Sequence, residues 1–203
     1  MMEPGKLNLR SRFASWVKRK IMPDTRSDKI REVAAKIGVP ADWLDSIIAF
    51  ESSYDPQAQN PIPYNKAKVD AGIEAPRHAR GLIQFIDSTA AELGYADSYE
   101  LVASLPDFDS QMDGAVLPYF VRRMPFYSKQ DFFMSVFYPS YRKVPAEKPF
   151  PDTVIAVNPG IRTPQDYINK VEARVALGRL IRPAGGIAVI AVAAAGAWLL
   201  MRG

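Results

Sequence analysis

Apolar residues recur at helical spacing along most of this chain, and prolines and glycines divide the pattern into short segments. In residues 28–37 the apolar side chains share one helical face, and Gly38 ends the segment. Pro40 opens the next segment, whose apolar stretch ends at Glu51. Further helices are expected over residues 88–93, 98–103, 108–123, 129–138 and 164–180. Because strand patterns are nearly absent, the sequence predicts a mainly α fold.

The composition argues against several classes of function. The 203 residues include no cysteine, which excludes a disulfide framework and a thiol nucleophile. The single histidine, His78, excludes a histidine-cluster metal site and argues against a Ser-His-Asp triad. The chain has no phosphate-binding glycine loop and no zinc-ligand spacing, so neither a cofactor nor a metal is expected. The net charge of +4 suits an anionic cell-wall polymer or lipid, and no nucleic-acid partner is expected.

Glu51 is the candidate for proton-transfer chemistry. It follows the apolar stretch 43–50, where apolar surroundings and the negative pole of the helix both disfavour the charged carboxylate. A carboxyl group whose pKa is raised in this way can donate a proton to a leaving oxygen near neutral pH, as glycosidic bond cleavage requires. A solvated carboxylate without a catalytic role is the alternative interpretation.

Two ordered segments carry a family resemblance. Residues 51–61 read Glu-Ser-Ser-Tyr-Asp-Pro-Gln-Ala-Gln-Asn-Pro, and residues 79–90 read Ala-Arg-Gly-Leu-Ile-Gln-Phe-Ile-Asp-Ser-Thr-Ala. The first segment resembles the catalytic-acid motif of the soluble lytic transglycosylase family, and the second resembles the motif that follows it. The resemblance covers roughly residues 28–142. It implies a lysozyme-like fold and cleavage of peptidoglycan glycan strands.

The resemblance also implies that Glu51 acts as both acid and base. It would protonate the glycosidic oxygen between N-acetylmuramic acid and N-acetylglucosamine, and then deprotonate the muramoyl C6 hydroxyl to close a 1,6-anhydro ring. Most glycosidases use two carboxylates instead. Asp55 and Asp87 are the candidates for a second carboxylate if the enzyme is a hydrolytic muramidase, but each is also explained as a turn or cap residue. A third interpretation is a non-catalytic peptidoglycan-binding structural protein.

Four residues of the two segments and one later tyrosine are candidate substrate-binding residues. They are Ser53, Gly81, Gln84, Phe85 and Tyr138. The resemblance implies that Gln84 lines the cleft and contacts the sugar, and a hydrogen bond to the loop backbone is the alternative role. Gly81 is expected to permit a positive φ or a close backbone approach. Ser53 is expected to steady the turn after the helix and not to act as a nucleophile, because no base accompanies it in any detectable motif.

Tyr138 aligns with the tyrosine of a third family motif, Ala-Tyr-Asn-Ala-Gly. It is expected either to orient Glu51 through its hydroxyl or to be an ordinary core aromatic. The next three residues, 139–141, read Pro-Ser-Tyr and depart from that motif. The departure leaves the acid assignment intact and the details of sugar binding open.

The chain divides into four parts. Residues 1–26 form a basic amphipathic segment, 27–145 the lysozyme-like transglycosylase domain, 146–182 a proline-rich connector and helix, and 183–203 a C-terminal transmembrane anchor. Within the domain, residues 62–78 are expected to form a loop-like insertion that flanks the active-site cleft.

The anchor is expected because residues 183–201 carry no charge and are just long enough to cross a bilayer. A buried helix, or a helix that packs in an oligomer, is the alternative. The predicted fold class is therefore mainly α, a lysozyme-like transglycosylase domain with a C-terminal single transmembrane helix. The N-terminal segment is expected either to lie on an anionic membrane or to dock on the protein's own core.

The charges beside the expected anchor suggest a biological setting. Basic residues precede the anchor, which by the positive-inside tendency places the catalytic domain on the cytoplasmic side. Residues 1–22 lack the apolar core of a secretory signal. Both features favour a phage virion protein that breaches the cell wall, with virion proteins or a second copy of the chain as partners through the tail. An enzyme of the bacterial cell envelope is the alternative.

Overall fold

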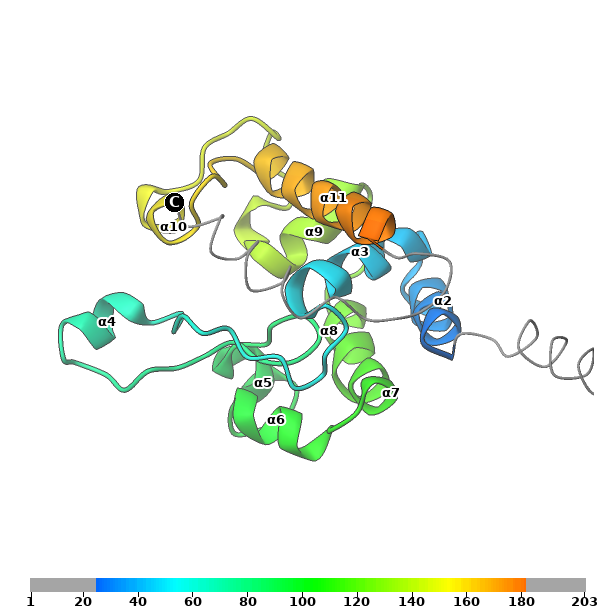
Figure 1. The fold of residues 1–203 in the computed structure, drawn as a ribbon, viewed down its shortest axis with the longest axis horizontal. Coiled ribbons are helices and arrows are strands. Elements are labelled where there is room, and N and C mark those ends of the chain that lie inside the picture. Colours follow the sequence, from blue (N-terminus) through cyan, green and yellow to red (C-terminus); the bar gives the residue numbers. More distant parts are fainter. Residues whose placement is uncertain (1–24, 182–203) are drawn as a thin grey trace, which may run out of the picture.

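The structure is a computed structural model that describes residues 25–181, and within this range it is helical (Figure 1). In chain order its α-helices are α2 (Thr25–Ile37), α3 (Ala41–Ser52), α4 (Lys66–Asp70), α5 (Asp87–Glu92), α6 (Ser98–Ser104), α7 (Phe108–Gln111), α8 (Leu117–Val121), α9 (Lys129–Phe137), α10 (Asp152–Val157) and α11 (Pro164–Ile181). A π-helix, η1 (Met112–Val116), joins α7 to α8, and a 3-10 turn, η2 (Pro139–Tyr141), follows α9. The mainly helical architecture agrees with the sequence pattern.

Helices α2, α3, α8 and α9 share a hydrophobic core that holds the site in place. Val33 of α2 and the α3 residues Leu44 and Ile47 are fully buried. Phe132 of α9 lies in the same core, and its ring stacks on that of Phe120 of α8 with centroids 4.7 Å apart. Each such side chain contributes roughly 1.5–3 kcal/mol when it is fully buried. The position of α3, which carries Glu51, is therefore fixed along most of its length.

The two ends of α3 are formed by local backbone conformations. Gly38, at φ +70°, turns the chain after α2, and Pro40 immediately precedes α3. At the other end Ser53 adopts a left-handed conformation, and its amide donates to the carbonyl of Ala49 at 3.1 Å. Glu51 therefore lies in the last turn of the helix, where the apolar stretch stops.

Helix α11 packs against α3 and α9 (Figure 1). It begins where the sequence predicts, because the amide of Asp166 donates to Thr163 Oγ1 at 3.2 Å and caps the first turn. Its side chains Tyr167, Ile168 and Val171 are buried in the same core as α3 and α9. The sequence places this helix in a separate part, at 146–182, yet the structure gives it a share in the core of the preceding domain.

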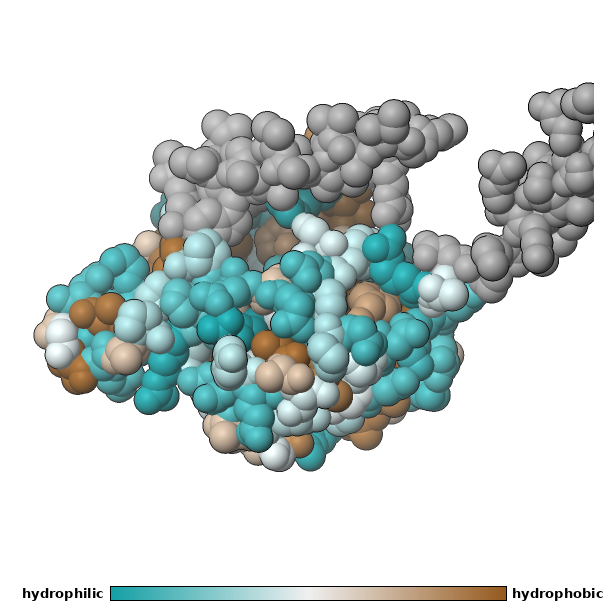
Figure 2. Space-filling model, turned by 60° about the horizontal axis from the view of Figure 1, so that its bottom comes forward, coloured by the Kyte–Doolittle hydropathy of each residue, from teal (hydrophilic) through white to brown (hydrophobic). Residues whose placement is uncertain are grey.

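Residues 59–80 form an arm that projects from the helical body (Figure 1). Its two sides are joined by backbone hydrogen bonds, from the amide of Asn60 to the carbonyl of Ala79 and from the amide of Tyr64 to the carbonyl of Arg77, each 2.9 Å long. Helix α4, at the far end of the arm, is too short to leave a periodic pattern in the sequence. The arm extends to the left of Figure 2, where exposed apolar side chains interrupt a mostly hydrophilic surface.

The single helix expected over 108–123 is divided into α7, η1 and α8. The amide of Leu117 donates to the carbonyl of Met112, five residues earlier, which is the π-helical pattern. Pro118 follows and has no amide hydrogen, so one helical hydrogen bond is absent at this point. The apolar pattern predicts the helical stretch but contains no sign of the wider turn.

The prediction of a membrane anchor is corrected. No helix within residues 25–181 is long and apolar enough to cross a membrane. Helix α11, which leads toward the expected anchor, carries Asp166, Lys170 and Glu172, and charges of this kind are costly inside a bilayer. The expected anchor itself, at 183–203, and residues 1–24 of the basic segment 1–26 lie outside the described residues. The fold class with a transmembrane helix and the membrane-anchored location are both withdrawn.

Candidate active site

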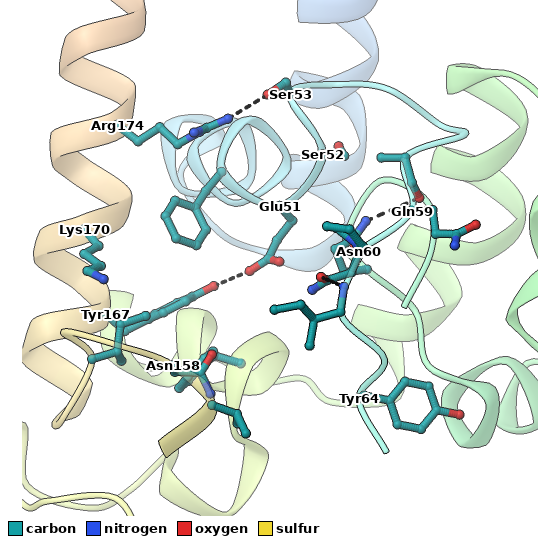
Figure 3. A pocket seen from close by; sticks show the side chains of 18 of the residues that line it. Glu51, Ser52, Ser53, Gln59, Asn60, Tyr64, Asn158, Tyr167, Lys170 and Arg174 are labelled. Atoms are coloured by element: carbon teal, nitrogen blue, oxygen red, sulfur yellow. Dashed lines mark hydrogen bonds between the residues drawn. The ribbon is translucent and has the colours of Figure 1, made fainter. Parts of the chain in front are cut away.

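A cleft of about 740 Å³ lies at the C-terminal end of α3 (Figure 3). One wall is the base of the arm, residues 59–64, and the facing wall is α11. Phe137, residues 157–159 at the end of α10, and Ile161 also line the cleft. The arm therefore flanks the cleft, as the sequence predicts for the insertion at 62–78.

Glu51 projects into the cleft between α11 and the arm (Figure 3). Burial raises the pKa of its carboxyl group to about 7, while the hydrogen bond from Tyr167 and the charge of Arg174 act in the opposite direction. Near neutral pH the group can therefore exchange between its protonated and its charged form. Glu51 is also the only carboxylate among the described residues that line the cleft.

Tyr167 of α11 holds the Glu51 side chain in place. Its hydroxyl donates to Glu51 Oε1 at 2.6 Å, and its ring is fully buried. The ring stacks on Phe137 with centroids 4.4 Å apart and meets Phe50 edge-on at 5.5 Å, so the phenol has little freedom to move. Burial and the nearby Glu51 carboxylate raise the pKa of Tyr167 well above its ordinary value. The phenol therefore remains a hydrogen-bond donor.

Two cations, Lys170 and Arg174, lie beside Tyr167 on the cleft face of α11 (Figure 3). Lys170 Nζ donates to the carbonyl of Pro159 at 2.5 Å, and burial lowers the pKa of this amine. The Nη2 atom of Arg174 donates to Ser53 Oγ at 3.1 Å. Within residues 25–181, neither cation has a carboxylate oxygen close enough to form an ion pair. The sequence indicated these two residues only as part of the basic stretch before the expected anchor and not as site residues, because cations on a helix are usually solvated.

The turn after α3 brings Ser53 to the cleft. Ser53 and Tyr54 both adopt positive φ angles, 54° and 68°, which non-glycine residues rarely do. The hydroxyl of Tyr54 donates to Asp45 at 2.9 Å and holds the turn against α3. Ser53 lines the cleft and, as expected, has a place in the turn; no base contacts it in the described structure.

The second motif segment contributes Gln84 to the lining of the cleft. Gln84 lines the cleft with φ +57°, and its Nε2 donates to the carbonyl of Gly81 at 3.0 Å. This bond is the loop-backbone role considered as an alternative for Gln84. Gly81 is buried and has φ +77°, which agrees with the expectation that a glycine here permits a positive φ. Phe85 is buried against Tyr119, so Gly81 and Phe85 support the cleft from behind without lining it.

A buried glutamine that the sequence did not identify joins the two motif segments. Gln111 Nε2 donates to the carbonyl of Pro56 at 2.6 Å, and its Oε1 accepts from the amide of Leu82 at 3.0 Å. A Cβ atom on Gly81 would lie 2.7 Å from Gln111 Oε1, so the glycine is also required for this close approach. The sequence feature that could have identified Gln111 is its position as a polar residue inside the apolar helical stretch 108–123.

Tyr138 lies away from the cleft. Its ring packs on Phe150 and Tyr141, with centroids 5.7 Å and 5.2 Å away, and it is not among the residues that line the cleft. The phenol that contacts Glu51 belongs to Tyr167 instead. The family motif directed attention to the end of α9, whereas the contact comes from α11.

The two other carboxylates considered from the sequence have structural partners. Asp55 accepts from the amide of Gln57 at 2.8 Å and forms a turn. Asp87 accepts from both the amide and the hydroxyl of Ser98, at 3.1 and 2.8 Å. Neither lines the cleft. Among the described residues, no group of three His, Cys, Asp or Glu side chains is placed to hold a metal ion.

Comparison with known proteins covers part of the chain. The family model described as Transglycosylase SLT domain matches residues 28–105. This range contains both motif segments, 51–61 and 79–90, so the resemblance to soluble lytic transglycosylases is confirmed there. No curated protein and no solved structure matches the chain. Helix α11, with its contact to Glu51, lies beyond the matched range.

Proposed function

We propose that this chain, whose residues 28–105 match the transglycosylase SLT domain, is a peptidoglycan lytic transglycosylase. Its substrate would be the β-1,4 bond between N-acetylmuramic acid and N-acetylglucosamine, and its product a 1,6-anhydromuramoyl end. The observation that carries the proposal is Glu51, a carboxyl group with a pKa of about 7 that has no second carboxylate beside it in the described cleft.

In the first step protonated Glu51 acts as general acid. Because Oε1 accepts the Tyr167 hydrogen bond, Oε2 is the oxygen that carries the proton to the glycosidic oxygen. The bond between muramoyl C1 and that oxygen breaks, and the N-acetylglucosamine part leaves as an alcohol. Positive charge develops on the muramoyl ring, and Glu51 becomes a carboxylate. Tyr167 and Arg174 favour that carboxylate through a hydrogen bond and a positive charge.

In the second step the Glu51 carboxylate acts as general base. It takes the proton of the muramoyl C6 hydroxyl while the C6 oxygen attacks C1 and closes the anhydro ring. The carboxyl group is protonated again at the end, and no water is consumed. A pKa near 7 suits both steps, because the group can lose and regain a proton at little cost.

The lone carboxylate favours this route over hydrolysis. A hydrolase of the usual kind needs a second carboxylate about 5–10 Å from the first to activate water or to form a covalent intermediate. Asp55 and Asp87 are engaged elsewhere, in a turn and with Ser98. A hydrolytic muramidase and a non-catalytic binding protein remain the alternative outcomes of the experiment.

Product analysis distinguishes the three possibilities. Purified peptidoglycan is digested with the full chain in ¹⁸O-labelled water, and the released fragments are weighed by mass spectrometry. Anhydro ends, lighter by one water and free of label, are expected. Reducing ends that carry the label would identify a muramidase, and the absence of fragments would identify a binding protein. The Glu51→Gln variant is the control for a contaminating hydrolase.

A role in breaching the cell wall during phage infection is the setting that the sequence suggests for this activity. The test is mass spectrometry of purified virions from the source phage, if the gene lies among virion genes. Detection of the chain in virions at a stoichiometry similar to that of other structural proteins supports the role. Its absence from virions favours an enzyme of the bacterial cell envelope.

A further inference from the structure

The cleft face of α11 presents three polar groups in one row. Tyr167, Lys170 and Arg174 are spaced three and four residues apart, so they lie above one another on the same side of the helix (Figure 3). The first of them contacts Glu51, and the other two extend the row along the cleft wall. The facing wall of the arm, residues 59–64, has no charged side chain.

Both cations have hydrogen-bond donors to spare. The ammonium group of Lys170 offers three N–H donors and the guanidinium group of Arg174 offers five, and within residues 25–181 the side chain of each donates to one acceptor. The carboxylates of α11 beside the two cations, Asp166 and Glu172, are already engaged. Asp166 accepts from the amides of Arg162 and Thr163, and Glu172 pairs with Lys129 on another face of α11.

Resting on the proposed function, we propose that Lys170 and Arg174 form a subsite for a carboxylate of the substrate. Peptidoglycan supplies this group on every second sugar. N-acetylglucosamine is neutral, whereas N-acetylmuramic acid carries a lactyl group whose carboxyl is either free or linked to a peptide with carboxylates of its own. Apart from Glu51, these two cations are the charged side chains among the described residues that line the cleft, and their spare donors match an anionic group of this kind.

The subsite would set the register of the glycan strand. The two sugars alternate along the strand, so a strand shifted by one ring presents the other type of glycosidic bond to Glu51. Placing the carboxylate on Lys170 and Arg174 selects the register in which the muramoyl C1 lies beside Glu51. The cations thus determine which bond is cleaved, in addition to holding the strand.

Binding measurements separate this inference from the catalytic proposal. The full chain with Glu51→Gln is titrated calorimetrically with three glycan strands of equal length: strands with intact peptides, peptide-free strands with a free lactyl carboxylate, and peptide-free strands whose lactyl carboxyl is converted to an amide. We expect the amide strands to bind about tenfold more weakly than at least one of the carboxylate-bearing strands. The carboxylate-bearing strand that binds more tightly than the amide strand identifies the source of the carboxylate, which is either the lactyl group or the peptide.

Variants at the two cations complete the experiment. Lys170→Gln and Arg174→Gln, each in the Glu51→Gln background, should abolish the preference for carboxylate, while Lys170→Arg and Arg174→Lys should retain most of it. Lys148→Gln is the control, because Lys148 is exposed and lies outside the cleft. Equal binding of all three strands, or a preference that survives both glutamine variants, overturns the inference. Failure of the wild-type chain to release anhydro fragments would count against the catalytic proposal and leave this binding result as it stands.

Discussion

The hydroxyl of Tyr167 donates a 2.6 Å hydrogen bond to Glu51 across a sequence separation of 116 residues. The acid comes from the end of α3, within the matched family range, and its partner comes from α11, beyond that range. The bond favours the carboxylate, whereas burial favours the neutral acid. The balance of these two effects places the pKa of Glu51 near 7 and is the basis of the predictions that follow.

Glu51→Gln should reduce the rate of peptidoglycan cleavage by about 10²–10⁴-fold or more, because one carboxyl group serves both proton transfers. The amide keeps the shape of the side chain but transfers no proton. Turbidity clearing and fragment release on purified peptidoglycan measure the effect. Glu172→Gln, an exposed change on α11, should leave the rate unchanged. Activity of Glu51→Gln close to wild type would remove Glu51 from the mechanism.

The pH dependence of kcat/KM should follow the acid form of Glu51. Because burial raises its pKa to about 7, the group is mostly protonated below that pH and mostly charged above it. The rate should therefore decline as the pH rises through about 7, approaching a tenfold loss for each further unit. Rates on peptidoglycan fragments at constant ionic strength measure this limb. A flat profile from pH 5 to about pH 9 would contradict it.

Glu51→Gln should also stabilise the fold at alkaline pH. In the unfolded chain the Glu51 carboxyl ionises near its ordinary value of 4.5, and in the folded chain near 7, so the folded state binds the proton more tightly. The charge on Glu51 therefore does not lower the stability of the fold below pH 4.5. The loss of stability grows as the pH rises from 4.5 and is complete above about pH 7. We expect the variant to raise Tm by a few degrees at pH 8 and by much less at pH 4. An equal change in Tm at both pH values would show that packing, not charge, is responsible.

Tyr167→Phe should raise the pKa of Glu51 and slow the reaction. The change keeps the buried ring but removes the hydrogen bond that favours the carboxylate. The falling limb of the pH profile should move to higher pH, and kcat should decrease by about 10–100-fold because the carboxylate formed in the first step loses a donor. Tyr138→Phe removes the same hydroxyl from a ring outside the cleft and should change neither quantity. If Tyr138→Phe changed the pH profile and kcat while Tyr167→Phe changed neither, Tyr138 would be the tyrosine that orients Glu51.

Gly81→Ala should destabilise the fold more than Gly72→Ala. Both glycines have positive φ angles, +77° and +70°, so both substitutions cost about 1–2 kcal/mol of backbone strain. At Gly72 a Cβ atom meets nothing within 4 Å, whereas at Gly81 it lies 2.7 Å from Gln111 Oε1. We expect an additional loss of about 1–3 kcal/mol at Gly81. Urea unfolding of the two variants measures the difference, and equal losses would show that the loop absorbs the clash.

The sequence predicts much of the helical framework, because apolar periodicity and local caps determine it. The helix after residue 28, the helix ending near Glu51 and the helix that Thr163 caps all occur at the expected positions. Helices α4 and α10 were not expected, since five or six residues are too few to show a period. The predicted transmembrane helix at 183–203 was wrong as a description of the fold class, since no helix within residues 25–181 could cross a membrane.

The site was predictable only in part. Motif spacing locates Glu51, Ser53 and Gln84, which the structure brings to one cleft. The contacts of Tyr167 and Arg174 with that cleft depend on how α11 packs on α3, and no local pattern encodes that packing. Long-range packing therefore decides which tyrosine faces the acid.

The distance along the chain between Glu51 and Tyr167 also has a consequence for timing. During synthesis on the ribosome, Glu51 emerges 116 residues before the phenol that orients it. A nascent or truncated chain that ends before α11 holds the acid but lacks its donor, both cleft cations and one wall of the cleft. The cleft is thus completed last, because its full lining exists only after nearly the whole helical body has been translated and folded.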